Sequence, residues 1–488
     1  MSPALILACI CGYFLFLLVI AWSTSRDAGN DAYFLGNRAS PWYAVAFGLI
    51  GDSLSGVTFI SVPGQVGKAN FSYLQIVFGY VLGYLVIARV LLPLYYRLQL
   101  TSIYSYLLDR FGPNSQKTGA FFFLLSRTVG AAARLYLTAS VIQLFVFDKW
   151  GFPFWATVAI IIALILLYTY KGGIKTLVWT DTFQSSFLLL GVILSIAAVA
   201  RQLNWGLGEM VSAISESSYS QIFVWEWQHK KFFWKEFFSG AAIAIVMTGL
   251  DQNMMQKNRS CRSLGEAQKN IYSFTAVLVF VNVFFVSLGA LLYAYAHAKG
   301  ISIPVRTDHL FPMLALQHLG TFAAIAFIVG LTAATFSSAD SVLTTLTTSF
   351  CIDFLGTDRP GKYTEQRKTQ LRHITHIAFA FLLLAVILVL WWKSKNAAVI
   401  TIVFATAGYT YGPLLGLFAF GLFFKSRVRD GWVPLIGCLS PLLCWGISYN
   451  SKKWFGGYEM GFELLILNGL LVALGLFLLR KPPSPQPI

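Results

Sequence analysis

Charged residues are scarce in this chain, and their scarcity excludes an ordinary soluble domain. Only 11% of the 488 residues are Asp, Glu, Lys or Arg, whereas 57% are hydrophobic. A soluble globular protein usually carries about 25% charged residues. A soluble chain of this composition would expose too much apolar surface, so lipid must be the solvent for much of it. We therefore predict an all-α integral membrane protein.

The common motifs of enzyme chemistry are missing as well. The sequence has no Walker A loop, no GxGxxG after a strand, no HExxH and no GxSxG. Its six cysteines form no CxxC pair, which argues against a disulfide framework and against a zinc site. We therefore expect a protein that is not an enzyme.

Acidic residues are outnumbered by basic ones. The chain has 36 Lys and Arg against 20 Asp and Glu, a formal net charge of +16. No basic stripe is interleaved with aromatic residues, so we expect basic loops that face anionic lipid headgroups and no nucleic-acid partner.

Thirteen apolar segments are long enough to cross a membrane, which takes about 20 residues each. An odd number of crossings places the termini on opposite sides. With the N-terminus outside, the cytoplasmic segments hold 21 Lys and Arg, Lys257 and Arg259 among them, and the outer segments hold 12. This bias predicts a plasma (inner) membrane protein with a cytoplasmic C-terminus. The segments lie near residues 4–23, 42–63, 72–96, 118–147, 152–170, 182–201, 233–253, 271–297, 319–350, 374–392, 397–424, 431–448 and 460–479.

The span at 42–63 contains a polar, glycine-flanked stretch, GDSLSG, at residues 51–56. Such a stretch can unwind and free its backbone carbonyl oxygens. Free carbonyl oxygens are tolerated at membrane depth only where something binds them, and a small cation suits them. A flexible kink whose serines bond back to the helix is the alternative.

The span at 319–350 carries a stripe of small and hydroxyl side chains at helical spacing. Their oxygens suit a hard cation, although the stripe could also be a packing seam between helices. The stripe comprises Ala334, Ser337, Ser338 and Ser341, and Asp340 lies within it.

A second break is predicted at residues 247–252, which read MTGLDQ. This span and the span at 42–63 each open a block of five helices, and matching broken helices indicate an inverted-repeat transporter. We predict one transmembrane domain, 1–488, with a leading helix at 4–23, a first repeat at 42–201, an inverted second repeat at 233–424 and two further helices at 431–479.

At these residues the chain resembles the sodium:solute symporter family. The likeness runs from about residue 30 to 425 and implies a LeuT-type core of five plus five helices, with sodium as the coupling ion. It implies a secondary active symporter that imports a small solute by alternating access. Four motifs carry it: WTDTFQ at 179–184, GLDQNMMQ at 249–256, FSSADS at 336–341 and YGPLLGLFAFGLF at 411–423.

The resemblance also implies where sodium binds. The principal site of the family uses two carbonyl oxygens of the first broken span and an Ala-x-x-Ser-Ser group. The matching positions are Gly51 and Leu54, with Ala334, Ser337 and Ser338.

Some members of the family bind a second sodium ion, and Asp181, Ser338 and Ser341 match the residues that hold it. Asp340 departs from the pattern, which has a hydroxyl or small residue there, so one ion and two ions both remain open. Asp181 also opens a span, where an aspartate can simply cap the helix.

The solute is predicted from five positions that resemble those of sialic acid carriers. Hydroxyls in the first broken span match Ser53, Ser55 and Thr58, and Arg127 and Arg134 lie one turn either side of the family's arginine position. For Arg134, an ion pair or a snorkelling head group is the alternative.

We therefore predict a polar or anionic organic solute, sialic acid-like or monocarboxylate-like. The segment SGVTFISVPGQV resembles the branch of the family that carries monocarboxylates. A neutral sugar, proline or another amino acid is the alternative, and a channel or a membrane enzyme would be a different class. The sequence carries no prediction of oligomeric state.

Overall fold

The computed structural model describes residues 2–24, 40–98, 102–169, 174–359, 361–393 and 398–481. Within these ranges the side chains at 21, 24, 168, 169, 174–177, 338 and 340 are not described. This part of the chain folds into helices, and its β-type pairing is limited to two isolated bridges, Ser40 with Cys261 and Val428 with Arg480. The prediction of an all-α protein is confirmed.

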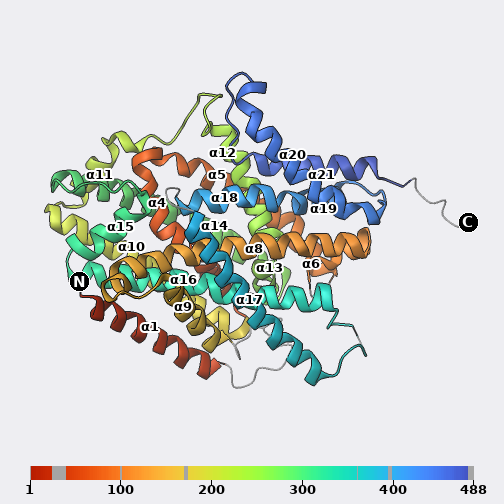
Figure 1. The fold of residues 1–488 in the computed structure, drawn as a ribbon. Coiled ribbons are helices and arrows are strands. Elements are labelled where there is room, and N and C mark those ends of the chain that lie inside the picture. The colour runs from red at the N-terminus through yellow and green to blue at the C-terminus, as the bar shows by residue number, and fades with distance from the viewer. Residues whose placement is uncertain are drawn as a thin grey trace, which may run out of the picture.

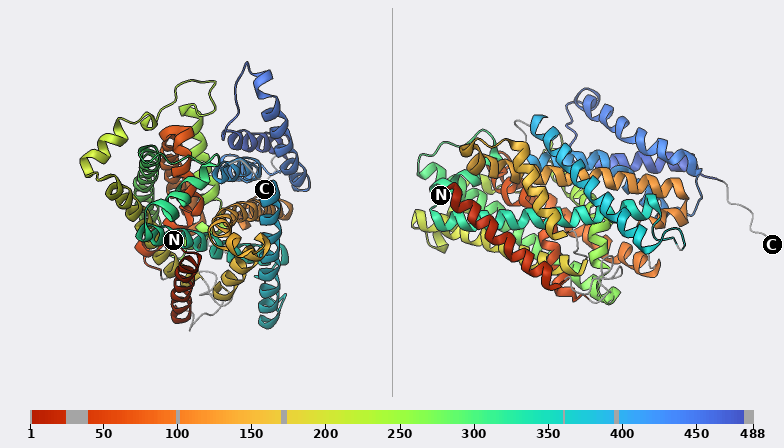
Figure 2. Two further views of the ribbon diagram at one scale, coloured as in Figure 1. Left: turned by 60° about the vertical axis from the view of Figure 1, so that its left-hand side comes forward. Right: turned by 60° about the horizontal axis from the view of Figure 1, so that its bottom comes forward.

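The helices form an elongated bundle, in which α1 begins at one end and α21 finishes at the other (Figures 1 and 2). The first ten are α1 (Pro3–Thr24), α3 (Trp42–Ser53), α4 (Gly56–Ala69), α5 (Tyr73–Val86), α6 (Leu92–Leu98), α7 (Ser105–Arg110), α8 (Pro113–Ile142), α9 (Phe154–Thr169), α10 (Ile174–Leu203) and α11 (Leu207–Ser215). They are followed by α12 (Phe233–Ala244), α13 (Gln252–Asn258), α14 (Leu264–Ala298), α15 (Leu310–Met313), α16 (Thr321–Ser349), α17 (Glu365–Lys393), α18 (Val399–Thr410), α19 (Gly412–Phe423), α20 (Val433–Trp454) and α21 (Leu464–Leu478).

Many of these helices are long and apolar enough to cross a membrane. Eight qualify among the described residues, and up to ten if each of two sharply bent helix pairs counts as one span. The bent pairs are Phe233–Gly249 with Gln252–Asn258 and Val399–Thr410 with Gly412–Phe423. The chain is therefore a multi-pass membrane protein.

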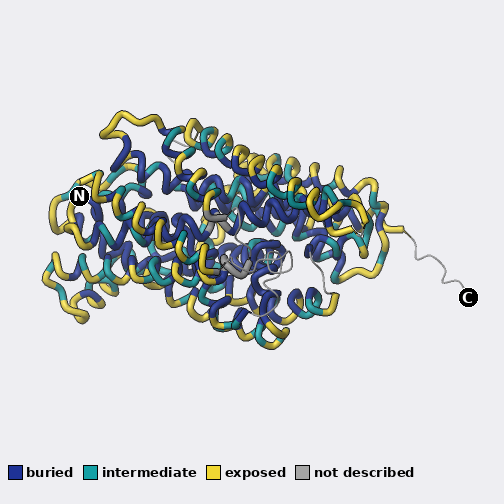
Figure 3. The backbone as a smooth tube through the Cα atoms, turned by 90° about the horizontal axis from the view of Figure 1, so that it is seen from below, coloured by how far each residue is buried: buried dark blue, intermediate teal, exposed yellow. Residues whose placement is uncertain are grey.

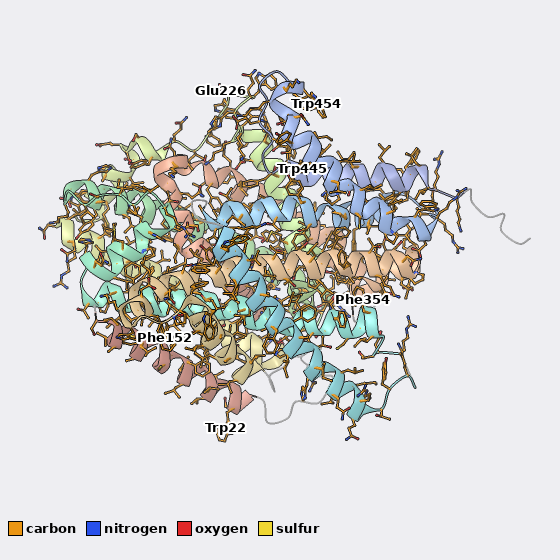
Figure 4. All side chains as sticks on the ribbon, viewed as in Figure 1. Trp22, Phe152, Glu226, Phe354, Trp445 and Trp454 are labelled. Carbon is orange, nitrogen blue, oxygen red and sulfur yellow. The ribbon has the colours of Figure 1, made fainter. Side chains whose placement is uncertain are left out.

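Exposed residues lie on the outside of the bundle and buried residues fill its interior (Figure 3), and many of the exposed residues are large and apolar. Trp22 on α1 is 64% exposed, and Trp445 on α20 is 61% exposed. Both point away from the bundle, as does Trp454 (Figure 4). Lipid and the membrane interface are the environments in which such side chains are stable.

Both predicted helix breaks are confirmed. The first separates α3 from α4 at only two residues, Leu54 and Ser55, and is therefore narrower than the predicted stretch 51–56. The second follows a π-helical turn at Ile245–Gly249 and separates α12 from α13 with a bend of 69°.

The second half of this broken helix lies deep in the bundle. The short helix α13 packs against α3, α10 and α16, and α10 packs along both α3 and α16. Every residue of α13 is buried. The two breaks and the polar face of α16 therefore meet at the centre of the molecule.

Candidate functional site

The carbonyl oxygens freed by the two breaks have different surroundings. At the second break, the carbonyl oxygen of Gly249 accepts a hydrogen bond from the Tyr95 hydroxyl at 2.9 Å. That of Leu250 accepts one from the Tyr104 hydroxyl at 3.0 Å. At the first break, the carbonyl oxygen of Leu54 accepts no backbone hydrogen bond within the described part of the chain. Tyrosine hydroxyls thus satisfy the carbonyl oxygens of the second break, whereas the Leu54 carbonyl oxygen of the first break is available to a ligand.

Three helices meet at Gly51, the last glycine before the first break. Its N–H donates to the hydroxyl of Ser185 on α10 at 2.8 Å. A Cβ at this position would lie 2.7 Å from the Ser185 hydroxyl and 2.8 Å from the hydroxyl of Ser337 on α16, so any side chain here would displace these hydroxyls. Glycine therefore lets the backbone of α3 approach the polar face of α16.

The Ser337 hydroxyl also donates to a carboxylate oxygen of Asp181 at 3.2 Å. Asp181 lies on α10 and is fully buried. The structure thus brings Gly51, Ser337 and Asp181 together, with the buried Ala334 one turn before Ser337 on α16. The side chains of Ser338 and Asp340 lie outside the described residues.

A lysine occupies the centre of this cluster. The ammonium nitrogen of Lys257, at the end of α13, lies 2.5 Å from Asp52 Oδ2, 2.5 Å from Asp181 Oδ2 and 2.8 Å from the hydroxyl of Ser341. The Lys257 side chain is 1% exposed and both carboxylates are 0% exposed. Two of the residues predicted for a second sodium ion, Asp181 and Ser341, therefore face an ammonium group.

The burial of Lys257 changes the count of loop charges from which the orientation is predicted. Their position after the span at 233–253 predicts that Lys257 and Arg259 lie in a cytoplasmic segment, but they are 1% and 5% exposed inside the protein. The assignment was wrong because α13 continues the broken span and folds back into the bundle. The charge bias is smaller without these two residues, and its direction is unchanged.

A cavity of about 80 Å³ adjoins the first break. The tyrosines Tyr73, Tyr80 and Tyr84 form part of its wall. Asp52 and Leu54 also line it, so the cavity touches the cation cluster directly. All five residues predicted to contact solute line this one cavity: Ser53, Ser55, Thr58, Arg127 and Arg134.

The two arginines on α8 differ in their partners. Arg127 Nε lies 3.3 Å from Asp251 Oδ2, and both side chains are buried. Asp251 caps α13 by accepting the N–H of Met254 at 3.2 Å. Arg134 is 8% exposed, and its Nε and Nη1 have no hydrogen-bond partner among the described residues. Both arginines line the cavity, but only the charge of Arg127 has an acidic partner among the described residues.

A second cavity, of about 160 Å³, continues from the first, because Tyr73, Ile400 and Phe404 line both. Two lysines, Lys230 and Lys231, lie in its wall. Burial lowers the pKa of Lys231. Glu236 also lines this second cavity, which we call the antechamber, so its wall carries two basic groups and one acidic group.

The antechamber lies beside the contact between two loops. The amide of Gln228 donates to the carbonyl oxygen of Gly456 at 3.1 Å. Glu226 and Trp454, which flank this contact in sequence, lie close together at the top of Figure 4. The antechamber therefore lies on the side of the bundle where the chain segments before α12 and after α20 meet.

A bundle with broken helices, a buried cation cluster and a solute-sized polar cavity between them defines a secondary transporter. The model of the sodium:solute symporter family matches residues 33–435, and the chain belongs to this family. It is a sodium-coupled symporter of a small solute and not an enzyme.

Known relatives are similar to this chain over most of its length. The sodium/sialic acid symporter SiaT of Proteus mirabilis (strain HI4320) is 24% identical over 94% of this chain and 92% of its own length. The sodium-coupled monocarboxylate transporter 1 of Homo sapiens is 24% identical over 89% of this chain and 68% of its own. A solved structure of a sodium-coupled sialic acid symporter, substrate-bound and outward-open, matches 98% of both chains with a TM-score of 0.82 at 20% identity.

Three features of the site were missed from the sequence. These features are the role of Asp52, the position of Lys257 and the pairing of Arg127 with Asp251. A signal was present, since GLDQNMMQKN places Lys257 one short helix after the predicted break. A polar segment that follows a broken span can re-enter the protein instead of forming a loop.

Proposed function

We propose that this symporter imports a small organic anion, sialic acid-like or monocarboxylate-like, together with sodium by alternating access. The observation that carries the proposal is Arg134, which lines the cavity and whose buried Nε and Nη1 have no hydrogen-bond partner among the described residues. A buried, unpaired charge is costly. A carboxylate in the cavity would remove that cost with charge-assisted hydrogen bonds.

The remaining cavity walls suit the rest of such a solute. Hydroxyls of Ser53, Ser55 and Thr58 can bond polar groups, and tyrosine rings offer apolar faces. The cavity of about 80 Å³ suits a short carboxylate by itself, while a sugar acid would extend into the antechamber. The names of the relatives support both kinds of anion.

The principal sodium site is proposed at Gly51, Leu54, Ala334, Ser337 and Ser338. The residues present fit a hard cation, because the Leu54 carbonyl is free of backbone hydrogen bonds in the described chain and the Ser337 hydroxyl lies against Gly51. Bound sodium supplies positive charge beside the Asp181 carboxylate.

Coupling is proposed to run through the first break. Gly51 and Leu54 face the cation site, while Ser53, Leu54 and Ser55 line the solute cavity. Because these residues are consecutive, a ligand that fixes their conformation at one site also fixes it at the other. Each ligand then lowers the free-energy cost of binding its partner.

We also propose thirteen spans in one domain, 1–488, with a LeuT-type five-plus-five inverted repeat, an outer N-terminus, a cytoplasmic C-terminus and insertion in the plasma (inner) membrane. The start of α1 and the end of α21 lie at opposite ends of the bundle, which supports an odd number of crossings (Figure 1). The exposed tryptophans support direct contact with membrane lipid.

A thermal-shift screen tests the function. The purified protein would be heated with sialic acid, lactate, galactose or proline, in sodium chloride or in potassium chloride. We expect an anion to raise the unfolding temperature, and to do so only with sodium. A rise with galactose or proline, but with neither anion, would replace the proposed solute with the neutral alternative.

A further inference from the structure

The hydrogen-bonding capacity of the Lys257 ammonium group is fully used. An ammonium group has three N–H donors. Three acceptors surround it within 2.8 Å: Asp52 Oδ2, Asp181 Oδ2 and the Ser341 hydroxyl. They come from α3, α10 and α16. These oxygens have the hardness that a small cation also prefers.

The backbone around Lys257 is held in place independently of its charge. Asp251 caps the start of α13 through the Met254 N–H. The Asn253 side chain accepts a hydrogen bond from Thr345 on α16 at 3.1 Å, and that of Asn258 accepts one from Asn270 on α14 at 2.6 Å. The short helix α13 is therefore fixed in place and positions Lys257 in the cluster.

Charge decides how many further cations this region accepts. Asp52 and Asp181 carry two negative charges, and Lys257 supplies one positive charge. Among these described side chains one negative charge remains, which matches one sodium ion at the principal site beside Ser337. A second sodium ion at Asp181 and Ser341 would have to displace the ammonium group or lie against a like charge.

We propose that the ammonium group of Lys257 takes the place of a second sodium ion, so that the carrier binds one sodium ion per cycle. The inference rests on the proposed principal sodium site and deepens it. Asp181 and Ser341 then serve as acceptors for the tethered ammonium, with Asp52 as its second counter-charge. The site is charge-balanced by a residue of the chain itself.

The experiment measures sodium binding directly, with solute uptake as a second readout. Radioactive sodium would be titrated onto purified full-length protein at fixed pH. The wild type should bind about one sodium ion per chain, and its uptake should have a Hill coefficient of about one for sodium. Lys257→Gln removes the charge and should open the second site, so that binding rises to about two ions per chain and the Hill coefficient rises above one.

Two further variants serve as controls. Lys257→Arg keeps the positive charge and should retain one sodium ion per chain. Lys235→Gln removes another buried lysine, one that donates to the carbonyl oxygens of His229 and Glu459, and should leave sodium stoichiometry unchanged. If Lys257→Gln does not fold, the wild-type stoichiometry still decides.

The outcomes separate this inference from the proposed function. Two sodium ions per wild-type chain, or one per chain in a folded Lys257→Gln, would overturn the role of Lys257 while sodium coupling stands. A wild type that binds no sodium would overturn the principal site, and the inference with it.

Discussion

The side chain of Arg134 offers a test in which stability and binding change in opposite directions. Its guanidinium is buried, and its Nε and Nη1 have no hydrogen-bond partner among the described residues. A buried donor without a partner costs about 1–3 kcal/mol. Arg134→Met keeps an extended side chain and removes the charge, so the solute-free protein should become more stable by up to about that amount.

The same substitution should weaken solute binding. A hydrogen bond to a charged group contributes about 1.5–3 kcal/mol, which corresponds to roughly 10- to 150-fold in Kd. The assay is thermal unfolding of purified protein in sodium chloride, with and without the anion found by the screen. Arg134→Met should unfold at a higher temperature than the wild type without solute and respond weakly when solute is added.

Arg127→Met is the matched control on the same helix. It removes the partner of Asp251 and leaves a buried carboxylate unpaired, which costs about 3–5 kcal/mol. This variant should therefore be less stable than the wild type with or without solute. If Arg134→Met is destabilised in the same way, or if it binds the anion as tightly as the wild type, Arg134 is structural and the proposed solute contact is refuted.

Three further substitutions test the cation site and the fold. Ser337→Ala removes one hard oxygen and should weaken sodium affinity in uptake roughly tenfold or more; an unchanged sodium dependence would remove α16 from the site. Gly51→Ala should weaken sodium-dependent uptake because its Cβ would displace the Ser185 and Ser337 hydroxyls, whereas Gly446→Ala on α20, where nothing lies within 4 Å, should transport normally. Asp430→Ala removes the acceptor for two backbone N–H groups at the start of α8 and should lower the free energy of unfolding by about 0.5–2 kcal/mol. Thermal unfolding checks this, and equal stability of the variant and the wild type would contradict the capping role.

The fold class and both helix breaks could be predicted because their signals are local. An apolar run long enough to span a membrane is read from composition, and a glycine-flanked polar stretch within it marks a break. The polar face that includes Ser337 follows from helical periodicity. The edges of the first break were less predictable, because hydrogen bonding holds α3 helical as far as Ser53.

The ion pairs could not be predicted because their partners are distant in sequence. Lys257 lies 205 residues from Asp52, 76 from Asp181 and 84 from Ser341. A lysine in a polar segment between two spans has the local pattern of a cytoplasmic loop. Only the packing of α13 against α3, α10 and α16 distinguishes the two cases. Likewise, the charges of Arg127 and Arg134 were visible in a span, but which of them is paired depends on where Asp251 lies.

Steady-state accumulation of labelled solute in proteoliposomes tests the central claim most directly. An inward sodium gradient would be imposed, with a potassium gradient as the control, and the membrane voltage would be set independently with an ionophore. One sodium ion carried with one monovalent anion moves no net charge. The account therefore predicts accumulation that requires the sodium gradient and does not change with voltage. Equal accumulation in potassium, or accumulation that rises with an inside-negative voltage, would contradict it.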